Sequence, residues 1–198
     1  MRGISREDLA SLPIRRYEGT VSLVATAKEL EQARVDFRQE RVVGFDTETR
    51  PSFRKGESHL PCLVQAATAR AVYLFQLSRL EVFPALVELL ARREIVKAGV
   101  GLDHDLRQLK RVFPFTVNNV LDLGVVARRS SLGQTGVRNL AGILLGFRIP
   151  KGNRTSNWAA PRLSPAQITY AATDAWVCRE LYLRFESLGL LVPARGPI

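Results

Sequence analysis

Short apolar runs alternate with capped or periodic helical segments along most of this chain, and this alternation constrains the fold class more than any other feature. The apolar runs predict strands at residues 20–24, 41–45, 63–68, 72–75 and 95–98. Helices are predicted at about residues 26–39, 84–92, 103–112, 119–130, 137–146 and 165–188. Thr26 and Ser164 each begin a capping box. Three consecutive strands followed by alternating helices and strands predict a mixed α/β sheet with helices on its faces.

The chain is long enough for one domain with a full hydrophobic core, since it has 198 residues. No internal repeat, low-complexity tract or Pro/Ser-rich linker marks a second domain. We therefore expect residues 1–18 to be a polar N-terminal extension and residues 19–198 to be a single domain. The hydrophobic content of 46% excludes wholesale disorder.

The sequence predicts a cytoplasmic protein that does not enter a membrane. No apolar run approaches the roughly 18 residues of a membrane span. Residues 1–16 lack the apolar core of a secretory signal. Cys62 and Cys178 lie far apart and form no CxxC pair, which argues against a disulfide framework or a zinc site.

The net charge of +10 indicates a polyanionic partner, and nucleic acid is the commonest one. Biased codon usage is an alternative explanation, because Arg outnumbers Lys by 24 to 5. The distribution of charge favours a phosphate-facing surface, since residues 123–173 contain no Asp or Glu. The basic residues of this acid-free segment are Arg128, Arg129, Arg138, Arg148, Lys151, Arg154 and Arg162.

An acidic pair, Asp46 and Glu48, stands at the end of the strand predicted at 41–45. Alternation along a strand points both carboxylates to the same side. Two crowded carboxylates repel each other unless a cation neutralises them, and hard oxygen ligands favour Mg²⁺ or Mn²⁺. A solvated strand end is the alternative interpretation of this pair.

A second group of acids follows a glycine turn after the strand at 95–98. Asp103 is interpreted as a helix N-cap. Asp105, inside the first helical turn, is better placed to point back across the sheet edge. His104 is interpreted as a surface residue, with metal ligation as the alternative.

The third group lies on the last predicted helix, where Tyr170 and Asp174 are four residues apart and share one face. Alanines surround Asp174, and it is the only acid between Asp122 and Glu180. A solvated helix face normally carries more charge, so this pair favours a functional site over a core aromatic and a surface ion pair. Asp122 is interpreted as a helix-start acid.

These three segments resemble the motifs of the DEDD superfamily of 3′–5′ exonucleases. The matching residues are Phe45-Asp46-Thr47-Glu48-Thr49, Lys97-Ala-Gly-Val-Gly followed by Asp105, and Tyr170-Ala-Ala-Thr-Asp174. The segment Ser156-Asn157-Trp158 resembles the same group. Because Thr169 stands where the histidine subtype carries histidine, the resemblance is to the tyrosine subtype, which contains ribonuclease D and the Werner-syndrome exonuclease domain.

The resemblance covers roughly residues 20–190 and implies a ribonuclease-H-like fold with two bound ions, Mg²⁺ or Mn²⁺. By analogy, Asp46 bridges both ions. Glu48 and Asp174 complete the site of the ion that activates water, and Asp105 supports the second ion directly or through water. Tyr170 orients the attacking water, because a phenol with a pKa near 10 is a poor base at neutral pH.

Four further residues are predicted to contact the nucleic acid: Arg54, Lys55, Arg154 and Trp158. The first two follow the acidic pair closely enough to add a phosphate contact. Trp158 either stacks on a base or fills the core beneath the last helix. The sequence ends ten residues after Leu188, so we expect no C-terminal helical domains like those of ribonuclease D.

The sequence therefore predicts a two-metal 3′–5′ exonuclease that releases nucleoside 5′-monophosphates from DNA, RNA or both. The alternative is a nucleic-acid-binding module without catalysis on the same fold, and a small-molecule enzyme is a more distant one. The choice between DNA and RNA depends on contacts to the 2′-hydroxyl, to which no residue is assigned. The oligomeric state is likewise not predicted.

Overall fold

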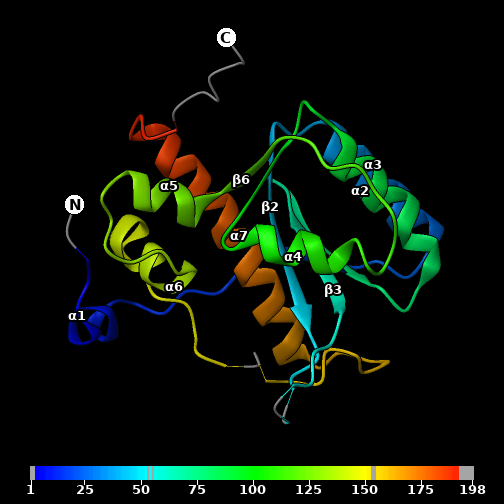
Figure 1. Cartoon of the computed structure of the whole chain (residues 1–198), viewed down its shortest axis with the longest axis horizontal. Coiled ribbons are helices and arrows are strands. Elements are labelled where there is room, and N and C mark those ends of the chain that lie inside the picture. The colour runs from blue at the N-terminus through cyan, green and yellow to red at the C-terminus, as the bar shows by residue number, and fades with distance from the viewer. Residues whose placement is uncertain (1–2, 53, 55, 153–154, 192–198) are drawn as a thin grey trace.

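A six-stranded mixed sheet forms the centre of the protein (Figure 1). The computed structural model describes residues 3–52, 54, 56–152 and 155–191. The strands are β1 (Thr20–Leu23), β2 (Val42–Thr49), β3 (Pro61–Ala67), β4 (Ala71–Gln76), β5 (Val96–Gly99) and β6 (Val120–Asp122), in the spatial order β1-β4-β3-β2-β5-β6. The mixed α/β sheet predicted from the sequence is confirmed.

Strands β2, β3 and β4, the three consecutive strands predicted from the sequence, form an antiparallel meander, while β1, β5 and β6 join the sheet by parallel pairing. Two predicted boundaries are wrong. Strand β2 continues through both acids to Thr49, because β3 pairs with it as far as Pro61. Residues 120–122 form β6 instead of the start of a helix, because Val120 and Leu121 pair with β5.

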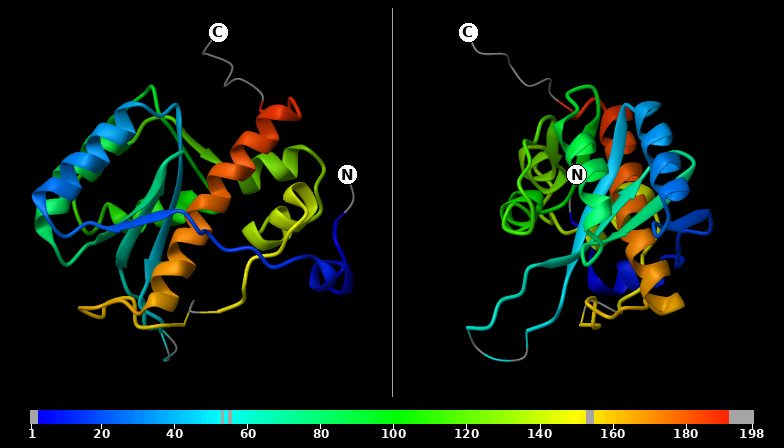
Figure 2. Two further views of the ribbon diagram at one scale, coloured as in Figure 1. Left: turned by 180° about the vertical axis from the view of Figure 1, so that it is seen from behind. Right: turned by 90° about the vertical axis from the view of Figure 1, so that its right-hand side faces the viewer.

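Helices cover both faces of the sheet (Figure 2). Their bounds are α1 (Arg6–Ser11), α2 (Ala27–Arg38), α3 (Phe83–Ala91), α4 (Leu102–Leu109), α5 (Leu123–Arg129), α6 (Val137–Leu140) and α7 (Pro165–Ser187), with a 3₁₀ turn η1 (Leu80–Val82) and a π-helical turn η2 (Ala141–Leu145). Helices α2, α3 and α4 pack on one face, and α5, α6 and α7 pack on the other. No helix among the described residues combines the length and apolarity needed to cross a membrane.

Both predicted capping boxes are present at the starts of α2 and α7. The Ser164 hydroxyl accepts from the Gln167 backbone N–H at 3.2 Å, and the Gln167 side chain accepts from the Ser164 N–H at 2.9 Å. Since Pro165 occupies the first helical position, the start of α7 is fixed by local sequence. The register of every residue along α7 follows from this start.

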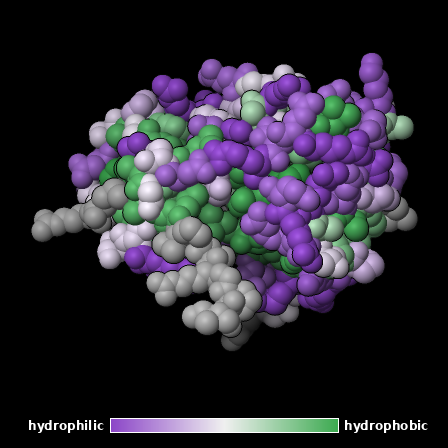
Figure 3. Space-filling model, turned by 90° about the horizontal axis from the view of Figure 1, so that it is seen from above, coloured by the Kyte–Doolittle hydropathy of each residue, from purple (hydrophilic) through white to green (hydrophobic). Residues whose placement is uncertain are grey.

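The outer surface of α2 and α3 is hydrophilic, as the right-hand side of Figure 3 shows. Glu88 of α3 pairs with Arg34 at 3.3 Å, with Arg38 at 3.4 Å and with Arg92 at 3.1 Å. These charges cross-link α2 to α3 over the apolar layer beneath them.

Helix α7 crosses the sheet diagonally and touches β2 at Gly44, as the left-hand view of Figure 2 shows for the two elements. A Cβ atom at Gly44 would lie 1.9 Å from the Ala175 carbonyl oxygen and 2.7 Å from the Arg179 backbone nitrogen. Only glycine permits this approach. Because Gly44, Asp46 and Glu48 alternate along β2, both acids face the same helix.

Residues 4–17, which we call the N-terminal strap, pack against the domain. Arg148 donates its backbone N–H to the Pro13 carbonyl and accepts from the Arg15 N–H, both at 2.9 Å. Side chains of Ile4, Leu9 and Leu12 surround Gly142 of η2. The strap contains helix α1, which the sequence analysis did not predict.

Candidate active site

Three carboxylates from β2 and α7 meet where the helix crosses the strand. Asp46, Glu48 and Asp174 each offer an oxygen atom, and the three atoms lie within 4.8 Å of one another. Glu48 and Asp174 are each only 7% exposed, whereas Asp46 is partly exposed. These three carboxylates, which the sequence analysis assigned to one site, are therefore adjacent.

The pKa values of Asp46 and Asp174 are raised, which is the effect of burying carboxylates close together without a cation to neutralise them. Burial raises the pKa of Asp46 well above its ordinary value, and the charges of Asp174 and Asp105 raise it further. Burial also raises the pKa of Asp174 to about 6, against the opposing effects of the Tyr170 hydroxyl and the Arg138 charge. Clustered carboxylates of this kind are the oxygen donors that hard divalent cations require. The residues present thus fit divalent metal ions.

The Tyr170 hydroxyl hydrogen bonds to the Asp174 carboxylate one helical turn away. Burial raises the pKa of the Tyr170 phenol, and the charges of Asp174 and Glu48 raise it further. The phenol therefore stays protonated at neutral pH. It is a hydrogen-bond donor, and it is not a base.

Asp105 approaches the cluster from the first turn of α4. It lies outside the group of three atoms but close enough for its charge to raise the pKa of Asp46. Burial raises the pKa of Asp105 to about 6, while His104 and a hydrogen bond from the Thr47 side chain oppose this rise. Thr47 therefore links Asp105 to the strand that carries the acidic pair.

Asp122 holds the turn that positions Asp105. One of its oxygens accepts from the N–H groups of Gly124 at 2.8 Å and Val125 at 3.3 Å, so Asp122 caps α5 as predicted. Its other oxygen accepts from the Gly101 N–H at 3.0 Å. This second bond has no signal in the local sequence, because it joins residues 21 positions apart.

The interpretation of Asp103 as a helix N-cap is wrong. Gly101, in a left-handed conformation with φ of 79°, occupies the cap position of α4. Asp103 is exposed and pairs instead with Arg107, one turn along the helix. His104 is exposed, as expected for a surface histidine.

Lys97 belongs to the second motif but faces away from the acids. Its ammonium group is fully buried and donates to the carbonyls of Arg92 at 2.6 Å and Ile95 at 2.8 Å. Burial lowers the pKa of Lys97 to about 8. The residue ties the end of α3 to β5, which is a structural role.

The predicted nucleic-acid contacts have different outcomes. Trp158 is 1% exposed and packs in the core with residues of β3, β4 and α7, so the stacking role is wrong and the core role is correct. Arg54 is exposed on the connection between β2 and β3. Lys55 and Arg154 lie outside the described residues.

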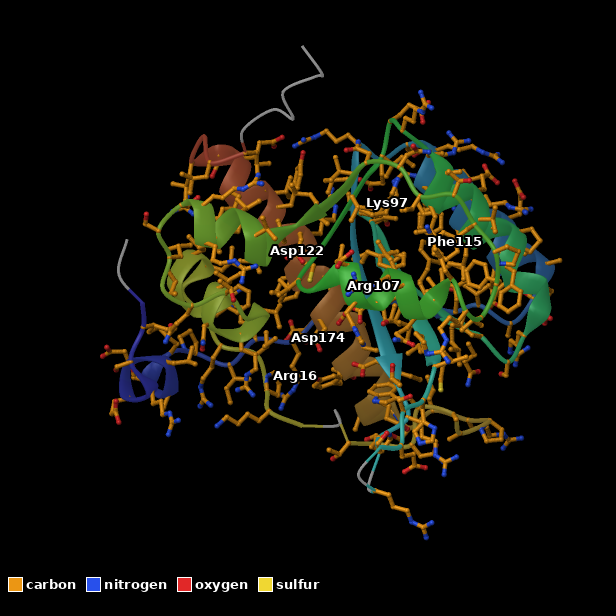
Figure 4. The ribbon with its side chains drawn as sticks, viewed as in Figure 1. Arg16, Lys97, Arg107, Phe115, Asp122 and Asp174 are labelled. Carbon is orange, nitrogen blue, oxygen red and sulfur yellow. The ribbon has the colours of Figure 1, made fainter. Side chains whose placement is uncertain are left out.

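A cavity of about 400 Å³ opens beside Tyr170 and Asp174. Arg16 of the strap and Lys151 also line it. Figure 4 shows Arg16 and Asp174 near the same part of α7, although they come from opposite ends of the chain. Arg16 was missed because it belongs to the segment predicted to be an extension.

A family model described as 3′–5′ exonuclease matches residues 21–189. The chain belongs to the 3′–5′ exonuclease family. The four acids and Tyr170 thus stand in a chain whose family is independently established.

Several known proteins are similar over most of this chain. The mouse bifunctional 3′–5′ exonuclease/ATP-dependent helicase WRN is 34% identical over 154 residues, which cover 75% of this chain and 11% of the mouse protein. The EXO domain of Aedes aegypti Nibbler is 24% identical with a TM-score of 0.77, covering 89% of this chain and 92% of that one. Trypanosoma brucei RNase D, solved in complex with RNA U12, is 22% identical with a TM-score of 0.75, covering 91% and 65%. These structures confirm the predicted ribonuclease-H-like fold.

Proposed function

We propose that this protein hydrolyses phosphodiester bonds from the 3′ end of DNA, RNA or both by a two-metal mechanism, releasing nucleoside 5′-monophosphates. The observation that carries the proposal is the meeting of Asp46, Glu48 and Asp174, with Tyr170 bonded to the last of them. Family membership supports the reaction, and the donor set supports the metal dependence.

Each acid has a role that follows from its place. The negative charges of both Asp174 and Asp105 act on the Asp46 carboxylate. We therefore expect Asp46 to contact both cations. Glu48 and Asp174 would complete one cation site with Asp46, and Asp105 would support the other from α4. When bound, two Mg²⁺ or Mn²⁺ ions supply a hydroxide nucleophile at neutral pH and stabilise the charge that develops on the phosphate.

Tyr170 orients the attacking water. Its hydroxyl is fixed by Asp174 and stays protonated, so it holds the water by a hydrogen bond and does not remove the proton. The RNA held by the Trypanosoma brucei RNase D supports RNA as one substrate class.

The proposal is tested with 5′-labelled single strands of matched DNA and RNA sequence, incubated with Mg²⁺ or Mn²⁺. A ladder of products that shorten from the 3′ end is expected, and its absence for both nucleic acids with both metals refutes the proposal. Asp46→Ala abolishes the ladder, whereas Asp103→Ala, which alters an exposed acid of the same charge, preserves it. Binding of the strands without any cleavage would establish a non-catalytic binding module.

A further inference from the structure

A second cavity, of about 830 Å³, continues from the one beside the catalytic acids. The two cavities share Arg16, Pro150 and Lys151 in their lining. Together they form a groove whose lining runs from Asp174 along the N-terminal strap to α1. Figure 4 labels Asp174 and Arg16, which line the part of the groove beside the acids. The strap supplies one wall, and residues of α6 together with residues 148–151 supply the other.

The lining of this groove is strongly cationic. Its basic residues are Arg6, Arg16, Arg138, Arg148 and Lys151, and the only acid among the described lining residues is Asp174 itself. Arg138 lies close enough to lower the pKa of Asp174. A row of cations that ends at a metal-binding carboxylate fits a polyanion whose last phosphate reaches the metals.

The two groove-lining cations of the strap have no competing acidic partner among the described residues. Arg6 and Arg16 are exposed, and neither guanidinium pairs with an acid among the described residues. Glu7 and Asp8 of α1 do not line the groove, and Asp8 is held by the Ser5 hydroxyl at 2.8 Å. Both arginines are therefore available to phosphate groups.

The strap is anchored as part of the site. The Tyr17 backbone N–H donates to the Thr173 hydroxyl at 3.0 Å, which fixes the strap one residue from Asp174. At its other end, Ile4 exchanges two hydrogen bonds of 3.0 Å with the Gln134 side chain. Because both ends of the strap are bonded to the domain, Arg6 and Arg16 lie on a wall of the groove that is fixed relative to Asp174.

We propose that the N-terminal strap binds the sugar–phosphate backbone of a single strand, on the 5′ side of the bond that the active site cleaves. The inference deepens the proposed function and rests on it, because that function places the 3′ end at Asp174. The strap precedes residues 21–189, so the family match does not account for it. The expected ligand is a single strand of several nucleotides, with Arg16 nearest the 3′ end and Arg6 farthest from it.

The test measures binding without cleavage. Fluorescence anisotropy of labelled dinucleotides and dodecanucleotides, DNA and RNA, is followed in EDTA over a series of salt concentrations. The variants are Arg6→Gln and Arg16→Gln, with Arg93→Gln as the control of equal charge. Arg93 is exposed, lines neither cavity and precedes β5, which runs parallel to β2, so it lies at the end of these strands away from the acids.

Each strap variant is expected to weaken dodecanucleotide binding roughly fivefold to tenfold and to reduce the slope of log K against log salt by about 0.7. The loss for Arg6→Gln grows with strand length, while the control keeps the wild-type affinity and slope. If Arg6→Gln and Arg16→Gln have the same affinity and the same slope of log K against log salt as Arg93→Gln, the inference is overturned. Thermal melting shows that the variants are folded. The anisotropy measurement reports strand binding without metal, so its result does not depend on whether the protein cleaves nucleic acid. The ladder assay tests the exonuclease proposal separately.

Discussion

Replacing Asp174 by asparagine removes one of three crowded negative charges while keeping the shape of the side chain. The carboxyl of Asp174 has a pKa raised from 3.8 to about 6, chiefly by burial. Because one pH unit corresponds to about 1.4 kcal/mol, ionised Asp174 destabilises the metal-free folded protein by up to about 3 kcal/mol near neutral pH. The negative charge of Asp174, which we propose binds metal, thus destabilises the folded protein when metal is absent.

The sign of the effect follows from the raised pKa. The folded protein holds the Asp174 proton more tightly than the unfolded chain, so this group favours folding below about pH 4 and the benefit is lost as pH rises through about 6. Asp174→Asn should therefore be more stable than the wild type by about 2 to 3 kcal/mol at about pH 7.5 in EDTA. At about pH 4 the two proteins should differ by less than about 1 kcal/mol, since the carboxyl is then neutral in the folded protein and about half protonated in the unfolded chain.

Urea unfolding in EDTA at both pH values, followed by circular dichroism, measures this difference. Repeating the measurement at the higher pH with Mn²⁺ should stabilise the wild type, while Asp174→Asn gains much less because it has lost one ligand. Asp103→Asn serves as the control, since its carboxylate is exposed and lies outside the cluster. A metal-free Asp174→Asn that is less stable than the wild type near neutral pH would refute the reasoning.

Three other substitutions test the supports of the site. Gly44→Ala, whose Cβ would lie 1.9 Å from the Ala175 carbonyl, should lower the free energy of unfolding by about 3 kcal/mol or more and reduce the stabilisation by Mn²⁺; wild-type values in urea would contradict it. Tyr170→Phe should retain that stabilisation but lower single-turnover cleavage about a hundredfold, so an unchanged rate would remove the positioning role. Asp122→Ala loses three backbone hydrogen bonds and should cost about 2 kcal/mol in thermal unfolding, whereas a cost near zero would show that the turn at Gly101 needs no support.

The parts predicted correctly from the sequence depend on local chemistry. The capping box at Ser164 fixes the start of α7, and a spacing of four then places Tyr170 beside Asp174. Alternation along β2 places Asp46 and Glu48 on one face. The candidate acids were identifiable because their geometry is determined within a few residues of sequence.

The parts that were missed depend on contacts between distant residues. Strand β6 has three residues and exists because Val120 and Leu121 pair with β5. The strap is fixed by partners at Gln134, Arg148 and Thr173, which no local pattern reveals. Trp158 illustrates the same limit, because only packing shows that its ring is enclosed.

The acids come from positions far apart in the chain, and this separation orders events during synthesis on the ribosome. A nascent chain that has completed the β2–β4 meander carries Asp46 and Glu48 but lacks Asp174, since α7 is the last helix among the described residues. The proposed nuclease activity therefore requires nearly the whole domain to have been translated.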